Sequence, residues 1–304
     1  MILTATVGAE FAGRRLDDGV KALFPDLSKG EIRRIIDRGG CTVNEALVRV
    51  ASRPLRSGDR IALGVMEAER FVELVYTKAD LLMEDDDYLA VDKASGLNCQ
   101  RTPYQLKGTV EYAVGVYLRE IGSSEPARVI HRLDRGTSGV MIFPKQKRAA
   151  THISYLLKHG GVEKIYWALV ADPPAEDSWE VDAPIAKVSK FRYGVGTPGR
   201  PARTEFRVLA RGRGVTLVEA RPKTGRTHQI RVHLSHVGLP IVGDLAYGGH
   251  PAPRMMLHCR FMAFKTRDGR LISAAAPVDA AFAEACREGK IDLAPFLAPR
   301  LEPA

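Results

Sequence analysis

A single carboxylate lies between two arginines in the segment VIHRLDRGTSG, which spans residues 129–139. Asp134 has Arg132 two positions before it and Arg135 directly after it. Neighbouring guanidinium groups keep a carboxylate ionised, and an ionised carboxylate can act as a nucleophile. The small residues of this loop equally allow an aspartate that only caps a turn. Asp134 is therefore a candidate nucleophile, with a turn cap as the alternative.

A second segment, PKTGRTHQIR at residues 222–231, combines a strand end with a helix start. We expect Gly225 to end the strand and Thr227 to cap the helix. The apolar face of that helix and the glycine that ends it are Ile230, Leu234, Val237 and Gly238. Arg226 would then lie at the helix N-terminus, where free backbone N–H groups and the helix dipole attract anions. The segment predicts an anion beside Arg226, either a phosphate or a carboxylate side chain.

A third segment, KIYWALV at residues 164–170, predicts a strand that carries an aromatic side chain. Tyr166 could serve as a platform for a planar ligand, although its neighbour Trp167 also needs burial, so a plain core role is the alternative. Metal binding is not indicated, because the histidines at 228, 233 and 236 would fall on different faces of a helix. The cysteines are far apart and include no C-x-x-C pair.

The elements that position these segments indicate an α+β fold. Strands are predicted at 88–93, 163–170, 204–209 and 215–220, and helices at 110–121 and around 153–157. They follow one another without a regular βαβ rhythm, so a mixed sheet is expected rather than a doubly wound one. Internal repeats and low-complexity segments are not found.

The first sixty residues predict a separate small module. A helix begins near Leu16 and stops at Pro25, and the spacing of Ser28 and Glu31 is that of a capping box that opens a second helix. The second helix ends at the Gly39–Gly40 pair. It carries a basic face formed by Lys29, Arg33, Arg34 and Arg38. This face could dock on RNA, or it could simply be a solvated charged surface.

The charge distribution favours a polyanionic partner. The net charge is +9; residues 11–63 carry +4 and residues 200–233 carry +7, whereas residues 64–92 are acidic. We interpret the acidic stretch as a solvated connector and place the domains at 1–63, 64–79 (linker) and 80–304. The N-terminus has no signal-peptide pattern and no window reaches membrane-spanning length, so we expect a cytoplasmic protein.

The motifs resemble two known families. Residues 15–17 (RLD), 28–29 (SK), 43–44 (VN) and 58–59 (GD) are similar to the α-L RNA-binding motif, although Glu45 stands where that motif usually has glycine, which leaves its hairpin turn uncertain. HRLDRGTSG, KIYWAL and KTGRTHQIRVH, in that order, resemble the RluA-like, ribosomal large-subunit type of pseudouridine synthase. This likeness covers about residues 80–275 and implies a mixed β-sheet domain with a central basic cleft.

The resemblance also implies roles for individual residues. Asp134 matches the nucleophilic aspartate, Arg226 the arginine that pairs with it, and Tyr166 the tyrosine that lies against the flipped uracil. Arg132 matches a residue that fills the space left by the base, with a simple salt bridge as its alternative. The remaining candidate RNA contacts are Lys223, Arg231 and the basic face of the N-terminal module. The sequence departs from the family at Ala94, where proline is usual.

The function implied is isomerisation of uridine to pseudouridine in RNA, most plausibly in large-subunit ribosomal RNA. Base flipping requires an aromatic platform and a substitute for the lost stacking, and the reaction involves no net redox change, so no cofactor is expected. Transfer RNA is the alternative substrate. A non-catalytic ribosome-assembly factor is the alternative from another class. A monomer with RNA as its partner, away from membranes, is expected.

Overall fold

The computed structural model describes residues 2–64, 74–102, 105, 107–189 and 192–297. The chain divides into two compact units, one formed by Met1–Tyr76 with Asn98–Gly122 and the other by Thr77–Leu97 with Ser123–Ala304. The segment Asn98–Gly122 thus groups with the N-terminal residues, although the sequence placed it within 80–304. The predicted linker lies partly outside the described residues, at 65–73.

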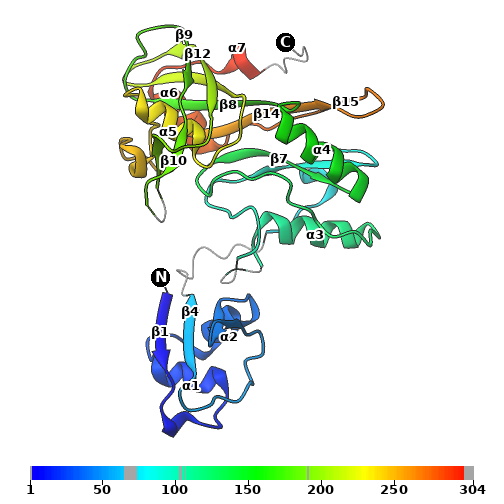
Figure 1. Ribbon diagram of the computed structural model, residues 1–304, viewed down its shortest axis with the longest axis vertical. Helices are drawn as coiled ribbons and strands as arrows, with labels where there is room; N and C mark the ends of the chain where they lie inside the picture. The colour runs from blue at the N-terminus through cyan, green and yellow to red at the C-terminus, as the bar shows by residue number, and fades with distance from the viewer. Residues whose placement is uncertain (1, 65–73, 103–104, 106, 190–191, 298–304) are drawn as a thin grey trace. The chain divides into compact units, whose positions relative to one another are not determined.

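The first unit contains a four-stranded sheet in the order β1–β4–β2–β3, on which α1 and α2 pack (Figure 1). Its elements are β1 (Ile2–Thr6), η1 (Ala9–Phe11), α1 (Leu16–Leu23), α2 (Lys29–Asp37), β2 (Cys41–Val43), β3 (Ala46–Leu47), β4 (Arg60–Gly64) and, from the later segment, α3 (Val110–Glu120). The predicted capping box of α2 is confirmed, because the Ser28 side chain accepts from Glu31 N–H and the Glu31 side chain accepts from Ser28 N–H. The apolar faces of α1 and α2 pack on the sheet through Leu16, Ile32 and Ile36, all fully buried.

The turn between β2 and β3 contains the glutamate that departs from the α-L motif. Val43 pairs with Ala46, so Asn44 and Glu45 form a two-residue loop, and their φ angles are +51° and +67°. Positive φ at both central positions is typical of a type I′ turn, which normally carries glycine at the second. Glu45 therefore keeps the hairpin geometry at the expense of a left-handed backbone.

The second unit is built on a large mixed sheet, which confirms the predicted α+β class. Within the described residues it has nine strands in the order β5–β6–β7–β14–β8–β13–β12–β9, with β15 paired to β14; β7 and β14 are parallel and the other pairs are antiparallel. The strands are β5 (Leu81–Glu84), β6 (Tyr88–Lys93), β7 (Ser138–Pro144), β8 (Glu163–Val170), β9 (Ser178–Asp182), β12 (Arg203–Arg211), β13 (Thr216–Pro222), β14 (Leu257–Lys265) and β15 (Leu271–Ala275). A separate hairpin pairs β10 (Ile185–Lys187) with β11 (Tyr193–Val195).

Helices pack against this sheet at several places (Figure 1). The helices of this unit are η3 (Lys78–Asp80), α4 (Lys147–His159), α5 (Gln229–His236), η4 (Leu245–Tyr247), α6 (Ala280–Glu288) and α7 (Ala294–Leu297). Helix α4 contacts β7, and α5 contacts β11, β12 and β13. One core cluster of this unit is shared by β8, β13, β14, α5 and α6. Within the described residues, none of the helices has both the length and the apolar character needed to cross a membrane.

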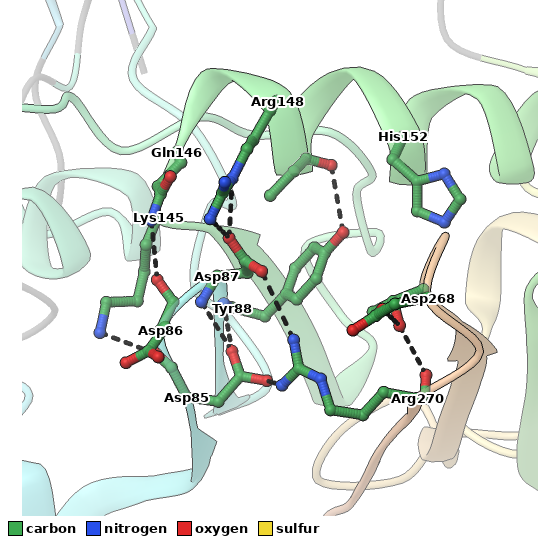
Figure 2. A network of polar contacts seen from close by, with 12 residues as sticks. Asp85, Asp86, Asp87, Tyr88, Lys145, Gln146, Arg148, His152, Asp268 and Arg270 are labelled. Carbon is green, nitrogen blue, oxygen red and sulfur yellow. Dashed lines mark hydrogen bonds and ion pairs between the residues drawn. The ribbon is translucent and has the colours of Figure 1, made fainter.

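Part of the acidic stretch that we interpreted as a solvated connector is a structural junction (Figure 2). The Asp85 carboxylate accepts from the backbone N–H of Asp87 and of Tyr88 at the start of β6 and forms an ion pair with Arg270 of the β14–β15 hairpin. Asp87 bonds Arg148 of α4 at 3.1 Å. That part of the interpretation was wrong, because these carboxylates join three elements that are distant in sequence.

Candidate active site

A pocket of about 340 Å³ in the second unit is lined by parts of all three segments singled out in the sequence. The HRLD loop contributes Asp134, strand β8 contributes Tyr166, and the segment before α5 contributes Arg226. Arg132 and Arg231 also line it. Residues separated by about ninety positions in the chain therefore share one concave, basic site, as the resemblance implied.

The Asp134 carboxylate is paired with Arg231. Arg231 Nη1 donates to Asp134 Oδ2 at 3.0 Å, while Nε and Nη2 of the same guanidinium bind both oxygens of the buried Asp244, at 2.7 and 2.9 Å. Burial lowers the pKa of Arg231. The hydrogen bond and charge of Asp244 and the charge of Asp134 together raise it by more, so the net pKa lies above its ordinary value. Arg231 is thus a fixed cation that joins two carboxylates.

The predicted pairing of Arg226 with Asp134 is wrong. Arg226 Nε donates instead to the carbonyl of Pro201 at 2.9 Å. The reason is a shift in the helix start: α5 begins at Gln229 rather than after a Thr227 cap. The Gln229 side chain accepts from Arg226 N–H at 2.9 Å and so fixes the backbone that precedes the helix. Arg231 therefore lies in the first turn of α5 and takes the position beside the carboxylate.

The end of β6 and the residues that follow it bind the loop that carries Asp134. Lys93 is fully buried, and its Nζ donates to the carbonyls of Ala94, Leu97 and Arg135 at 3.0, 3.0 and 3.3 Å. Gly96 N–H donates to Arg135 O at 2.7 Å. Because both bonds end on the backbone carbonyl of Arg135 and neither uses the side chain at position 94, the loop keeps its position although proline is replaced by Ala94.

The last glycine of HRLDRGTSG permits a close approach of two strands. Gly139 has φ +111° and lies against Cys259 where β7 and β14 run parallel. A Cβ at this position would come within 2.2 Å of the Cys259 carbonyl oxygen. Only glycine satisfies this backbone, and the contact fixes the C-terminal end of the Asp134 loop to the central strand of the sheet.

Tyr166 and Lys164 project into the pocket from alternate positions of β8, between β13 and β14. The half-buried Tyr166 ring suits a platform for a planar ligand. Lys164 Nζ has a long contact, 3.4 Å, with the carbonyl of Thr224, and burial lowers its pKa. Lys164 was not singled out from the sequence, where a lysine that opens a strand carries no distinctive signal.

A histidine and a tyrosine complete the site and were also missed. His228, the N-cap of α5, lies with Nε2 3.8 Å from Asp134 Oδ2 and Nδ1 2.8 Å from the Tyr247 hydroxyl. The Arg231 guanidinium stacks on the Tyr247 ring at 4.7 Å. Burial lowers the pKa of His228 against the opposing charge of Asp134. Among the described residues, no three His, Cys, Asp or Glu side chains are arranged to hold a metal ion.

The other predicted RNA contacts lie on the surface. Lys223 pairs with Glu205 at 2.8 Å. In the first unit, Lys29 pairs with Asp18 at 2.5 Å and Arg33 with the buried Asp17 at 2.7 Å. The exposed residues also include Arg132 and Arg34, whereas Arg38 is partly buried. Contacts of Lys29 and Arg33 with RNA would compete with these ion pairs, and the RNA-binding role of the whole set remains a prediction.

Comparison with known proteins agrees with this architecture. The family model described as RNA pseudouridylate synthase matches residues 87–236, and the S4 domain model matches residues 14–61. "Ribosomal large subunit pseudouridine synthase D" of Haemophilus ducreyi is 32% identical over 96% of both chains. The protein with the same description in Pseudomonas aeruginosa is 33% identical over 85% of this chain and 86% of its own.

Solved structures show the same fold. Human RNA Pseudouridylate Synthase Domain Containing 4 has a TM-score of 0.60 at 23% identity and covers 70% of this chain and 94% of its own. Human RNA Pseudouridylate Synthase Domain Containing 1 has a TM-score of 0.55 at 26% identity, with 67% and 86% covered. From the sequence relationships and the two matching models, the chain belongs to the RNA pseudouridylate synthase family and is a pseudouridine synthase with an N-terminal S4 domain.

Proposed function

We propose that this enzyme isomerises uridine to pseudouridine in large-subunit ribosomal RNA, with Asp134 as the nucleophile. The ribosomal substrate rests on the descriptions of the relatives from Haemophilus ducreyi and Pseudomonas aeruginosa. The observation that carries the site assignment is that Asp134 and Arg231 form an ion pair beside Tyr166 in one pocket, while Asp244 holds Arg231 from outside that lining. Transfer RNA is the second substrate to test.

The chemistry requires what this pocket offers. The reaction breaks the bond between N1 and C1′ of uridine, forms a bond between C5 and C1′, and exchanges the C5 proton for one on N1, so composition and redox state are unchanged. A carboxylate must remain ionised in a desolvated site to take part, and the Arg231 guanidinium favours the ionised form. Asp134 is therefore the residue best placed to attack.

The uracil must leave the RNA stack to reach this carboxylate. The pocket volume lies at the lower end of the range for small-ligand sites, about 300–1,000 Å³, and Tyr166 offers a ring against which a base can lie. Arg132, exposed two residues before Asp134, is proposed to occupy the space vacated by the base. Arg226, whose guanidinium is held by the Pro201 carbonyl, is assigned to substrate phosphate rather than to Asp134.

The S4 domain is proposed to supply sequence-independent affinity for RNA. Its α2 helix presents Arg34 to solvent, with Lys29, Arg33 and Arg38 on the same short helix or at its end. Phosphate contacts of this kind position an enzyme on RNA without selecting the target base. We propose that the enzyme is located in the cytoplasm and is a monomer. Light scattering of the purified protein would test the monomeric state.

Release of tritium from uracil C5 tests the proposal. Transcripts of bacterial large-subunit ribosomal RNA and of transfer RNAs, each tritiated at C5, would be incubated with the purified enzyme. We expect release from the ribosomal transcript. Release from transfer RNA alone would contradict the proposed substrate, and no release from either would favour a non-catalytic ribosome-assembly factor.

The role of Asp134 has its own test in the same assay. Asp134→Asn is nearly isosteric but removes the nucleophilic charge, so tritium release should be lost while RNA affinity, measured by filter binding, stays within about twofold. Asp172→Asn, a change outside the pocket, is the matched control. Residual wild-type turnover by Asp134→Asn would contradict the assignment.

A further inference from the structure

His228 has a contact with each end of its imidazole ring and an unusual backbone. Its φ is +58°, in the left-handed region, which non-glycine residues adopt at a cost of about 1–2 kcal/mol. Nε2 lies 3.8 Å from Asp134 Oδ2, and Nδ1 lies 2.8 Å from the Tyr247 hydroxyl. Strained conformations of this kind concentrate at functional sites, so the ring position requires an explanation.

The contacts of the ring favour one tautomer of the neutral imidazole. The Tyr247 oxygen accepts from the backbone N–H of Tyr193 at 3.1 Å. Its own O–H can then donate to His228 Nδ1, which leaves the proton of the neutral imidazole on Nε2. The opposite tautomer would point the Nε2 lone pair at an ionised carboxylate. The network therefore places an N–H on the nitrogen nearer to Asp134.

Edge contacts keep the ring in this orientation. The His228 ring meets the Tyr193 ring at 5.5 Å and 75° and the Tyr247 ring at 5.6 Å and 86°, both edge to face. The side chain of His228 is only 20% exposed. Two aromatic walls and one hydrogen bond thus restrict its rotation, so the direction of the Nε2 proton is fixed before substrate binds.

Arg231 and His228 both approach Asp134 on the side of one of its two oxygens, Arg231 within hydrogen-bonding distance and His228, at 3.8 Å, beyond it. Oδ2 accepts from Arg231 at 3.0 Å and faces His228 Nε2. Within the described residues, Oδ1 receives neither of these donors. The carboxylate is thereby held through Oδ2, which leaves Oδ1 without a hydrogen bond from either Arg231 or His228.

We propose that His228 is a positioning residue for the reaction: its neutral imidazole, set by Tyr247, presents Nε2–H to Oδ2 of Asp134 and so presents Oδ1 as the attacking oxygen. The proposal rests on the nucleophilic role of Asp134. When Oδ1 bonds to C1′, the N1–C1′ bond breaks and its electron pair leaves with the uracil; when C5 then bonds to C1′, the Oδ1–C1′ bond breaks and the carboxylate charge is restored. Nε2–H and Arg231 face Oδ2 in both steps and transfer no proton.

Two substitutions separate this role from a purely structural one. An asparagine at 228 accepts the left-handed backbone well and places an oxygen near Nδ1, so it can keep the Tyr247 contact while losing the donor to Asp134. A glutamine places an amide N–H near Nε2 and loses the acceptor at Nδ1. A structural role predicts that His228→Asn performs at least as well as His228→Gln. The positioning role predicts the reverse order.

The measurement is multiple-turnover tritium release from C5-tritiated large-subunit ribosomal RNA at varied RNA concentration, which gives kcat and KM. We expect His228→Asn to lower kcat about 10- to 50-fold with KM within about twofold, and His228→Gln to stay within about threefold of wild type. Tyr247→Phe, which removes the O–H that sets the tautomer, should also lower kcat more than it changes KM. His236→Gln, an exposed histidine on the same helix, is the control.

The outcomes distinguish this proposal from the proposed function. Release by wild type, combined with a kcat for His228→Asn equal to or above that of His228→Gln, would overturn the role of His228 alone. Wild-type behaviour of both variants would do the same. Release by Asp134→Asn at the wild-type rate would overturn the nucleophile and this proposal together, and so would the absence of release by wild type. Melting temperatures of the variants show whether a loss of kcat reflects unfolding.

Discussion

Arg231 can be distinguished from Arg226 by replacing each with lysine. The Arg231 guanidinium spans two carboxylates, with Nε and Nη2 on Asp244 and Nη1 on Asp134. A lysine has a single nitrogen and cannot occupy the same three positions. Arg231→Lys should therefore keep a positive charge near Asp134 but lose the geometry that joins the two acids.

The expected size of the effect follows from the number of hydrogen bonds lost. Each hydrogen bond to a charged group contributes about 1.5–3 kcal/mol, and lysine can replace one or two of the three. A net loss of about 3 kcal/mol in the transition state would lower kcat roughly 100-fold. Because Arg231 is only 11% exposed, solvent cannot compensate for the missing donors.

The assay is tritium release under saturating RNA, with Arg226→Lys compared in parallel. The Arg226 guanidinium donates to a backbone carbonyl, which an ammonium group can also reach, so we expect less than about a fivefold change in kcat. Equal losses in the two variants, or a wild-type rate for Arg231→Lys, would refute the assignment of Arg231 as the partner of Asp134. A variant that melts far below wild type would require Arg231→Gln as a second comparison.

Three further perturbations test other parts of the structure. Glu45→Gly should raise the unfolding free energy of the N-terminal unit by about 0.5–1 kcal/mol, because relief of the left-handed backbone exceeds the entropy of glycine; an unchanged urea midpoint would contradict this. Burial lowers the pKa of His258 to about 4, so below its ordinary value of 6.5 only the unfolded chain takes up the proton, and this residue alone should lower the unfolding free energy by about 3 kcal/mol between pH 6.5 and 4, in addition to the effect of His131, whose pKa burial lowers in the same way. His258→Gln should flatten that dependence, and an equally steep fall in this variant would exclude His258 as its source. Replacing Arg34 and Arg38 by glutamine should reduce the salt slope of RNA binding by about 1.5, and an identical slope would show that α2 does not contact phosphate.

The elements of the catalytic unit could largely be predicted from the sequence because they depend on local patterns. The strand predicted at 163–170 has those bounds as β8, and the strand predicted at 88–93 is β6. The capping box at Ser28 depends on two residues three positions apart, so the sequence contains all the information it needs. The positions of Asp134 and Tyr166 in one pocket came instead from the order of whole motifs, which only the resemblance could supply.

The partner of Asp134 could not be predicted because its identity depends on a helix start that local rules place incorrectly. Thr227 is a good N-cap by composition, yet α5 starts at Gln229, whose side chain binds Arg226 N–H and the carbonyl of Arg203. The left-handed backbone of His228 then turns the chain. Arg231 therefore takes the position beside Asp134 that was expected for Arg226. The cause is two contacts with residues some twenty-five positions earlier, which hold Arg226 and Gln229.

The acidic stretch shows the same limit at longer range. The count of charges predicted solvated carboxylates because it cannot include the arginine side chains that later segments of the chain place beside them. Arg148 and Arg270 lie 61 and 185 positions from their aspartate partners. Because ion pairs of this kind depend on sheet topology, they become visible only after β6, β7 and β15 have been placed (Figure 2).

The buried lysine beneath the catalytic loop explains how the site tolerates its departure from the family pattern. A proline at position 94 would restrict the chain by its ring, whereas here Lys93 Nζ binds three carbonyls, one before and one after the turn and one in the Asp134 loop. Ser95 Oγ adds a bond to Gly136 O at 2.8 Å. These contacts involve the backbone on the acceptor side, so they do not depend on which side chain follows Lys93. The loop geometry that Asp134 requires is thus set by a buried ammonium group, and Ala94 leaves that group in place.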